Sequence, residues 1–378
     1  MASFESGNRT QLSGGTGKLD GNLATFDAYQ HSIFNNNVLS LGAVVDIVKH
    51  PDVPDHDLFV VDTSTDRVVE TVDGLGTLLY GLAVDGDGAV YVAATEARND
   101  VNGRAGTKGH GLKELANRPF LNRITRWDSR GRPRFLELEP VPPAQPAPGK
   151  ALATPHGIAI ADRGSLLLAT ASGSDCVATI DPKTGAVLGR ASVGAAPQGV
   201  ALEEDTVRGT RRAWVLNAVS NSVSVVDVAN PRAPKTLSTV ALDDPTPALL
   251  RRGRAHFQSA RTSSTGTFSC ASCHPDGHTD QLLWVLDTPV VSGGKQIMPR
   301  STMPLRGLRD TEPFHWDGIP GDPYGGNNSA HVYSDVRPNV DSNDPLAAIR
   351  HLTDGSLGST MRAVDDSFVN NEGKKGRL

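Results

Sequence analysis

Long hydrophobic runs and cysteine are both scarce in this sequence. No stretch approaches the roughly 18 consecutive apolar residues that a transmembrane helix needs, so the chain is not expected to span a membrane. Only three cysteines occur among 378 residues. This number is odd, and Cys270 and Cys273 are three positions apart in one motif, so a disulfide framework is excluded. Cys176 begins the apolar run 176–180 and is predicted to be a small buried residue on a strand.

An excess of basic charge is also missing. The net charge of −5 provides no basic surface for nucleic acid or anionic lipid, and neither is an expected partner. Hydrophobic residues at 38% and charged residues at 21% are typical of a soluble globular protein. A length of 378 residues favours two domains, one of which is large enough to be an all-β propeller.

A degenerate repeat fills the first two-thirds of the chain. One half of each unit is a short strand that ends in Asp before a turn; these aspartates are Asp62, Asp128, Asp181 and Asp227. The other half is Gly followed by alternating apolar residues, and these glycines are Gly81, Gly157 and Gly199. Units of about 40 to 50 residues that hold several short strands are typical of β-propeller blades. The aspartates are interpreted as turn residues rather than as catalytic acids.

The repeat resembles the YVTN-type β-propeller repeats of exported bacterial proteins, and we predict a mainly β, WD40-like propeller domain over residues 35–243. Three or four blades are visible, whereas closed propellers have about four to eight, so the propeller is expected to be partial. Residues 1–34 are predicted to be a poorly ordered or partial strand segment. Insertions at 99–121 and 140–150 are expected to be surface loops.

A second domain is predicted over residues 244–378. It begins with a helix-like run at 248–257, in which Leu249, Leu250 and Phe257 share one face. The rest is rich in Gly, Pro, Asp and Asn and has little regular periodicity. We therefore expect a mainly α, loop-rich fold that is organised around a prosthetic group.

Cys270, Cys273 and His274 form a Cys-x-x-Cys-His motif. This spacing lets both thiols add to the two vinyl groups of haem while the next residue presents its imidazole to the iron. We predict one covalent haem c, attached at Cys270 and Cys273, with His274 as an axial ligand. The alternative is a zinc site with His278 as the fourth ligand, although no cysteine is left in this domain to complete a typical one.

The sixth iron ligand decides between an electron carrier and an enzyme, because a bound thioether closes the site and an open position admits peroxide. The candidates are Met298, Met303, His278 and His315. Both methionines precede proline, as in the Met-Pro dipeptide that supplies this ligand in small cytochromes c; their alternative role is packing beside the porphyrin. Residues suited to pair with haem propionates are Arg300, Arg306 and Arg309.

Four segments in order resemble the N-terminal haem domain of the bacterial di-haem cytochrome c peroxidase family, which includes propeller-fused members. The segments are 252–257, 268–277, 300–302 and 313–318. The resemblance covers about residues 247–320 and implies that Trp316, in a Trp-Asp-Gly motif, passes electrons between two haems. The alternative is that Trp316 is simply a buried core side chain.

The family's second haem needs another Cys-x-x-Cys-His motif, and this sequence has one only. We expect the second haem domain to belong on the C-terminal side. The family's catalytic acid has no match between Gly325 and Asp344, so a peroxidase-type oxidoreductase activity is left open. Calcium is implied by the family without identifiable ligands.

The sequence thus predicts an exported c-type cytochrome that transfers electrons within a di-haem cytochrome c peroxidase-like protein. Its expected partner is a small redox protein or a second haem domain. The alternatives are peroxide reduction at this haem, and a propeller interaction module with an accessory haem. The expected location is the periplasm or the cell surface; because residues 1–21 lack the apolar core of a secretory signal, we expect that signal to precede Met1.

Overall fold

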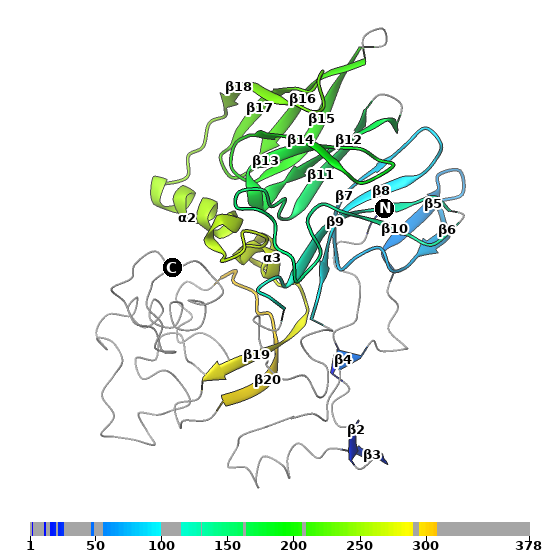
Figure 1. The fold of residues 1–378 in the computed structure, drawn as a ribbon, viewed down its shortest axis with the longest axis vertical. Coiled ribbons are helices and arrows are strands. Elements are labelled where there is room, and N and C mark those ends of the chain that lie inside the picture. Colours follow the sequence, from blue (N-terminus) through cyan, green and yellow to red (C-terminus); the bar gives the residue numbers. More distant parts are fainter. Residues whose placement is uncertain are drawn as a thin grey trace.

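The computed structural model describes residues 56–99, 115–129, 131–161, 164–205, 209–289 and 295–307, together with Ala2 and four short strands before residue 50. The short strands form two pairs (Figure 1). One pair is β1 (Gln11–Leu12) with β4 (Ile47–Val48), and the other is β2 (Thr16–Leu19) with β3 (Asn22–Thr25).

Three four-stranded antiparallel sheets make up most of the described chain between residues 56 and 243. The first contains β7 (Leu78–Val84), β8 (Val90–Ala97), β9 (Phe120–Trp127) and β10 (Arg134–Glu137). The second contains β11 (Pro155–Ala161), β12 (Leu166–Ala171), β13 (Cys176–Ile180) and β14 (Val187–Ser192). The third contains β15 (Pro197–Asp205), β16 (Gly209–Asn217), β17 (Ser222–Asp227) and β18 (Lys235–Ala241).

Each of these sheets is a meander in which neighbouring strands follow one another along the chain. They are preceded by a strand pair, β5 (Leu58–Asp62) and β6 (Arg67–Val72), and Figure 1 shows the sheets arranged as successive blades of a fan. The prediction of a mainly β, propeller-like fold is confirmed. Residues 140–150 form a largely exposed loop between β10 and β11, as predicted. The prediction of a surface loop at 99–121 is wrong in its described part, because residues 115–121 are buried or half-buried and Leu115, Arg118 and Phe120 pack into the interior. Residues 100–114 lie outside the described residues.

The glycines of the repeat allow the first strands of the blades to lie side by side. A Cβ at Gly81 on β7 would overlap the carbonyl oxygen of His156 on β11, and a Cβ at Gly157 would overlap that of Gln198 on β15. Only glycine permits so close an approach of two backbones. At Gly199 the nearest atom to such a Cβ is 3.4 Å away and belongs to Leu216 of the same blade.

The hydrophobic core is divided between the blades. One cluster joins β8, β9 and β10 to β12 and β13, and includes Ile124, Leu167 and Ile180. A second cluster joins β12 and β13 to β16 and β17, and includes Leu168 and Val215. Alternation along each strand therefore buries both faces of the middle blade.

The outer face of the third blade is uncovered among the described residues. Leu168 pairs with Ala159 in the middle blade, and Trp214 pairs with Ala201 at the same place in the third blade. Leu168 is fully buried, but Trp214 is 43% exposed and Leu216 is 44% exposed. The same repeat position is thus core in one blade and surface in the next.

This difference in burial predicts that replacing leucine by alanine lowers the free energy of unfolding more at Leu168 than at Leu216. Leu168→Ala is expected to lower the free energy of unfolding by about 2–5 kcal/mol, because it leaves a cavity between two blades. Leu216→Ala, the matched control, is expected to cost less than about 1 kcal/mol because water already reaches this side chain. Urea titration of both variants measures the two costs. Equal costs would mean that the outer face of the third blade is covered in solution.

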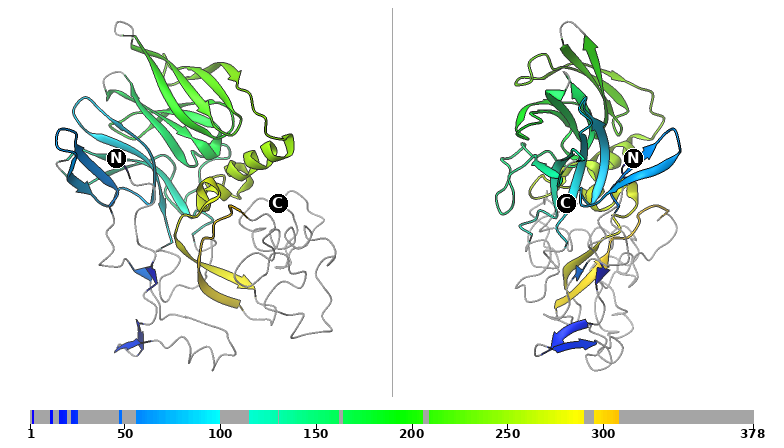
Figure 2. Two further views of the ribbon diagram at one scale, coloured as in Figure 1. Left: turned by 180° about the vertical axis from the view of Figure 1, so that it is seen from behind. Right: turned by 90° about the vertical axis from the view of Figure 1, so that its right-hand side faces the viewer.

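The chain after β18 forms helices and a hairpin. α2 (Ala248–Gln258) confirms the helix predicted at 248–257, but none of its side chains is buried. It is followed by η4 (Ala260–Thr262), α3 (Cys270–Cys273), η5 (Pro275–Gly277) and the hairpin of β19 (Leu283–Pro289) and β20 (Lys295–Ser301). Figures 1 and 2 show α3 at one end of the sheets, with the hairpin extending away from them.

The described part of the second domain does not show the mainly α fold that was predicted for residues 244–378. Between Asp244 and Gly307 it contains one longer helix, a few short turns and the hairpin. Residues 308–378 lie outside the described residues. None of the helices in the described ranges is long and apolar enough to cross a membrane.

Candidate functional site

Cys270 and Cys273 lie on α3, a single helical turn whose start is fixed by a capping box. Ser269 is the N-cap, and its backbone N–H donates to the Ser272 hydroxyl at 3.0 Å. The C-cap is His274, whose backbone N–H donates to the carbonyl of Cys270 at 2.9 Å. Residues three apart on a helical turn share one side, so Cys270 and Cys273 lie on the same side of α3, and His274 follows directly at its end.

The imidazole of His274 has its Nδ1 nitrogen engaged with the backbone. Its Nδ1 lies 3.3 Å from the carbonyl oxygen of His278, and because a carbonyl only accepts, Nδ1 carries the hydrogen. Burial lowers the pKa of His274, and contacts with the backbone of His278 and Met303 oppose this effect. The neutral ring keeps its lone pair on Nε2, which is the usual arrangement of a metal-binding histidine.

Both cysteines pack against an apolar cluster that the propeller and the motif segment build together. Its buried members are Leu78, Ala97, Leu115, Phe120, Phe268, Leu282 and Trp284. Burial raises the pKa of the Cys270 thiol, and burial together with Asp280 and Cys270 raises the pKa of Cys273. The apolar surroundings and the nearby Asp280 are therefore the causes of these raised pKa values.

The zinc alternative has no cluster to support it. Within the described residues, no three His, Cys, Asp or Glu side chains lie close enough together to hold a metal ion. Zinc in proteins usually needs about four such ligands. Haem iron needs only axial ligands from the chain, because the porphyrin supplies four nitrogens. The motif offers the two thiols and one imidazole that a c-type haem uses, and no fourth zinc ligand lies with them among the described residues.

The chain that follows the motif is folded back onto the propeller. Asp280 accepts a hydrogen bond from Trp284 Nε1 at 3.0 Å, and its own backbone N–H donates to the carbonyl of Cys273 at 3.0 Å. The Trp284 ring meets Phe120 of β9 edge to face, with 5.3 Å between the ring centroids. Trp284 thereby fixes the segment after the motif against the first sheet.

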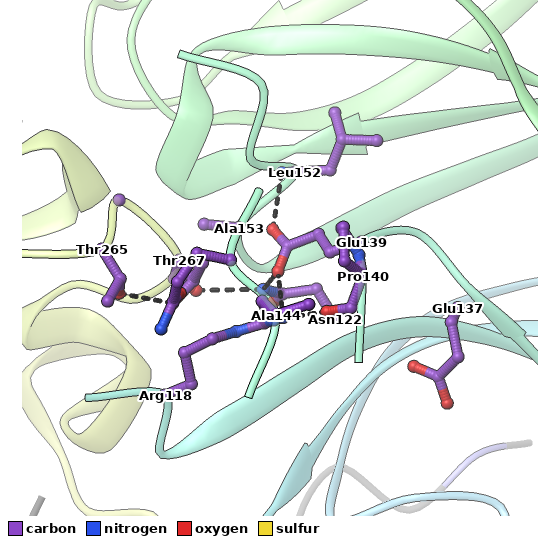
Figure 3. A network of polar contacts seen from close by, with 12 residues as sticks. Arg118, Asn122, Glu137, Glu139, Pro140, Ala144, Leu152, Ala153, Thr265 and Thr267 are labelled. Atoms are coloured by element: carbon purple, nitrogen blue, oxygen red, sulfur yellow. Dashed lines mark hydrogen bonds and ion pairs between the residues drawn. The ribbon is translucent and has the colours of Figure 1, made fainter. Parts of the chain in front are cut away.

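A buried polar network holds the segment before the motif (Figure 3). Arg118 and Glu139 form an ion pair with 2.8 Å between Nη2 and Oε2. The Asn122 side chain donates to Glu139 at 3.1 Å and to the carbonyl of Thr267 at 3.0 Å. Glu139 also accepts from the backbone N–H of Leu152 at 2.8 Å. Because Thr267 precedes Cys270 by three residues, this network fastens the motif to the propeller.

Other predicted site residues lie beside the motif or on the hairpin that follows it. Met303 lies with its backbone against the imidazole of His274, and Met298 lies on β20 opposite Leu286 of β19. His278 is exposed. Three predicted site residues lie outside the described residues, namely Arg309, His315 and Trp316.

Two further predictions can be compared with the structure. Arg306 donates from Nε to the carbonyl of Asp276 at 2.8 Å, and Arg300 lies opposite Trp284 in the hairpin. Cys176 is buried on β13, as predicted, and burial raises its pKa to about 11. Its thiol is therefore a structural core group.

Sequence reasoning missed two aromatic side chains of the propeller that lie near the motif. The rings of Tyr80 on β7 and His156 on β11 are 4.9 Å apart. Tyr80 packs against the apolar cluster that also contacts Cys270 and Cys273. A signal was available, because both residues immediately precede a repeat glycine, where the first strands of successive blades meet.

Comparison with known proteins gives only remote similarities. No protein-family model matches the sequence, and no curated protein matches it. The hydrazine synthase of Kuenenia stuttgartiensis is 18% identical with a TM-score of 0.35, over 45% of this chain and 51% of that one. The virginiamycin B lyase of Staphylococcus aureus is 14% identical with a TM-score of 0.31, over 56% of each chain.

The chain spans about half the length of these solved structures. A functionally unknown protein from Desulfotomaculum acetoxidans is similar at the same level, with 18% identity and a TM-score of 0.30 over 47% of this chain and 46% of that one. Identities and TM-scores this low assign no function to the chain.

Proposed function

We propose that this chain is an exported c-type cytochrome that carries one covalent haem and transfers electrons. Cys270 and Cys273 would hold the haem through thioether bonds, and His274 would bind the iron through Nε2. One observation carries the proposal: Nδ1 of His274 donates to the His278 carbonyl, directly after the helical turn that holds Cys270 and Cys273. Burial raises the pKa of both thiols.

The bound haem supplies the one-electron redox chemistry, and the chain controls its surroundings. The apolar cluster around Cys270 and Cys273 excludes water from the attachment edge, and burial of this kind is one of the factors that set a haem potential. The Asn122 contact to Thr267 keeps the attachment segment in place on the propeller. A haem attached to this segment would therefore be anchored to the propeller, which suits electron transfer.

The ordered segments between residues 252 and 318 support a place in a di-haem cytochrome c peroxidase-like protein. In that protein, electrons would come from a small redox protein or a second haem domain, and Trp316 would carry them between haems. The periplasm or the cell surface is the location that this chemistry requires. Calcium stays without assigned ligands.

The direct test is an optical spectrum of the chain expressed with bacterial cytochrome c maturation machinery. We expect the colour to stay on the polypeptide after acidified acetone extraction, since thioether bonds survive this treatment. The pyridine haemochrome spectrum then reports whether both vinyl groups have reacted. A folded but colourless protein would overturn the proposal.

A further inference from the structure

Two sixth-ligand candidates lie beside the imidazole of His274 itself. The carbonyl of His278 accepts from Nδ1 of that ring, and the backbone of Met303 contacts the same ring. A sixth ligand approaches the iron from the opposite side of the porphyrin. The backbones of His278 and Met303 lie instead beside the first ligand. Met298 lies on the hairpin, and His315 lies outside the described residues.

His156 on β11 has the features of such a donor. Its Nδ1 lies 3.1 Å from the carbonyl oxygen of Gln198 on β15, so Nδ1 carries the hydrogen and Nε2 keeps the lone pair. None of the described residues hydrogen-bonds to this Nε2. The arrangement repeats that of His274 with the His278 carbonyl, and a backbone carbonyl on one nitrogen is the common way to aim the other at a metal.

Burial keeps the His156 ring neutral. It lowers the pKa of His156, while the Gln198 carbonyl and the charge of Asp276 oppose the shift. The lone pair on Nε2 is therefore available at neutral pH. The Tyr80 ring, 4.9 Å away and tilted by 35°, also restricts the orientation of the imidazole.

His156 lies one aromatic ring away from the cysteines. Tyr80 contacts His156, and it packs against the same apolar cluster as Cys270 and Cys273. Asp276, two residues after His274, acts electrostatically on both Tyr80 and His156. A haem fixed at the cysteines would need to span about the width of Tyr80 to approach His156, and a porphyrin is much wider than one such ring.

We propose that His156 is the second axial ligand of the haem and that the first strands of the propeller, β7 and β11, form one wall of its site. The inference rests on the proposed function, because it needs the haem that Cys270 and Cys273 hold. It makes the iron six-coordinate with two imidazoles, and it gives the propeller a part in ligation.

The test compares the full chain, loaded with covalent haem, with His156→Ala. We expect the ferric wild-type protein to be low-spin in its electron paramagnetic resonance spectrum and its ferrous form to bind carbon monoxide poorly. His156→Ala is expected to become high-spin and to bind carbon monoxide readily, and added imidazole should restore the low-spin signal. The matched control His56→Ala, which removes an exposed histidine paired with Asp73, should leave the spectrum unchanged.

A second variant keeps the proposal testable if His156→Ala does not fold. His156→Met offers a thioether in place of the imidazole, and it is expected to raise the reduction potential and to add a methionine–iron charge-transfer band. A wild-type haem that is covalent but high-spin, a low-spin signal that survives in His156→Ala, or a His156→Met protein with neither the charge-transfer band nor the raised potential would overturn the ligation by His156 while leaving haem attachment intact. Loss of covalent haem from the wild-type chain would instead refute the proposed function.

Discussion

Glu139→Ala is expected to lower the free energy of unfolding by about 3–5 kcal/mol, since it leaves the buried Arg118 charge without its partner. The side chains of Arg118 and Glu139 are each only 1% exposed, so water does not replace the lost carboxylate. The variant also removes the acceptor of the Leu152 N–H, and it breaks one of the two hydrogen bonds that the Asn122 side-chain NH₂ group donates. Urea unfolding followed by circular dichroism measures the loss.

Asp128→Ala is the matched control for Glu139→Ala. Asp128 pairs with Arg126 at 2.8 Å, but the two side chains are 46% and 27% exposed, so its removal should cost less than about 1 kcal/mol. Glu139→Gln should fall between the two, because the amide oxygen still accepts from Leu152. A cost for Glu139→Ala no greater than that for Asp128→Ala would contradict the buried network of Figure 3.

Replacement of both Cys270 and Cys273 by alanine is expected to abolish covalent haem. Each single variant should keep one thioether and one free vinyl group, which shifts the pyridine haemochrome band to longer wavelength. The measurement is haem that stays with the polypeptide after acidified acetone extraction, relative to total protein.

The third cysteine provides the control for this pair. Cys176→Ala alters a buried strand residue that lies outside the motif, and it should keep the full amount of covalent haem. Covalent haem that persists in the double alanine variant, or that is lost in Cys176→Ala, would refute the assignment of the attachment sites.

The blade pattern was predictable because its causes are local. Asp62 accepts from the backbone N–H of Ser64 at 2.8 Å, and Asp181 accepts from that of Lys183 at 2.8 Å. Both contacts span two residues, so an aspartate followed by a turn appears directly in the sequence. The helix at 248–257 and the strand at Cys176 were predictable for the same reason, namely short-range alternation of apolar residues.

The contacts that position the candidate site join distant parts of the chain, and no local pattern predicted them. Asn122 reaches Thr267 across 145 residues, and His156 reaches Gln198 across 42. The hairpin of β19 and β20 was also missed, because a segment rich in Gly and Pro was interpreted as loop. The motif itself was recognisable since its three defining residues lie within five positions, and the attachment of haem there is a prediction for the spectrum to test.

A Gly199→Ala substitution would report whether the propeller continues past the third sheet and closes into a ring. At Gly81 and Gly157 the first strand of the following blade occupies the space that a Cβ needs, whereas at Gly199 this space is open in the described structure. Alanine at position 199 is therefore compatible with the partial propeller, and it would obstruct any blade that docks there in the manner of the others. Tolerance of alanine at this position distinguishes a fan that ends at the third sheet from a ring that continues past it.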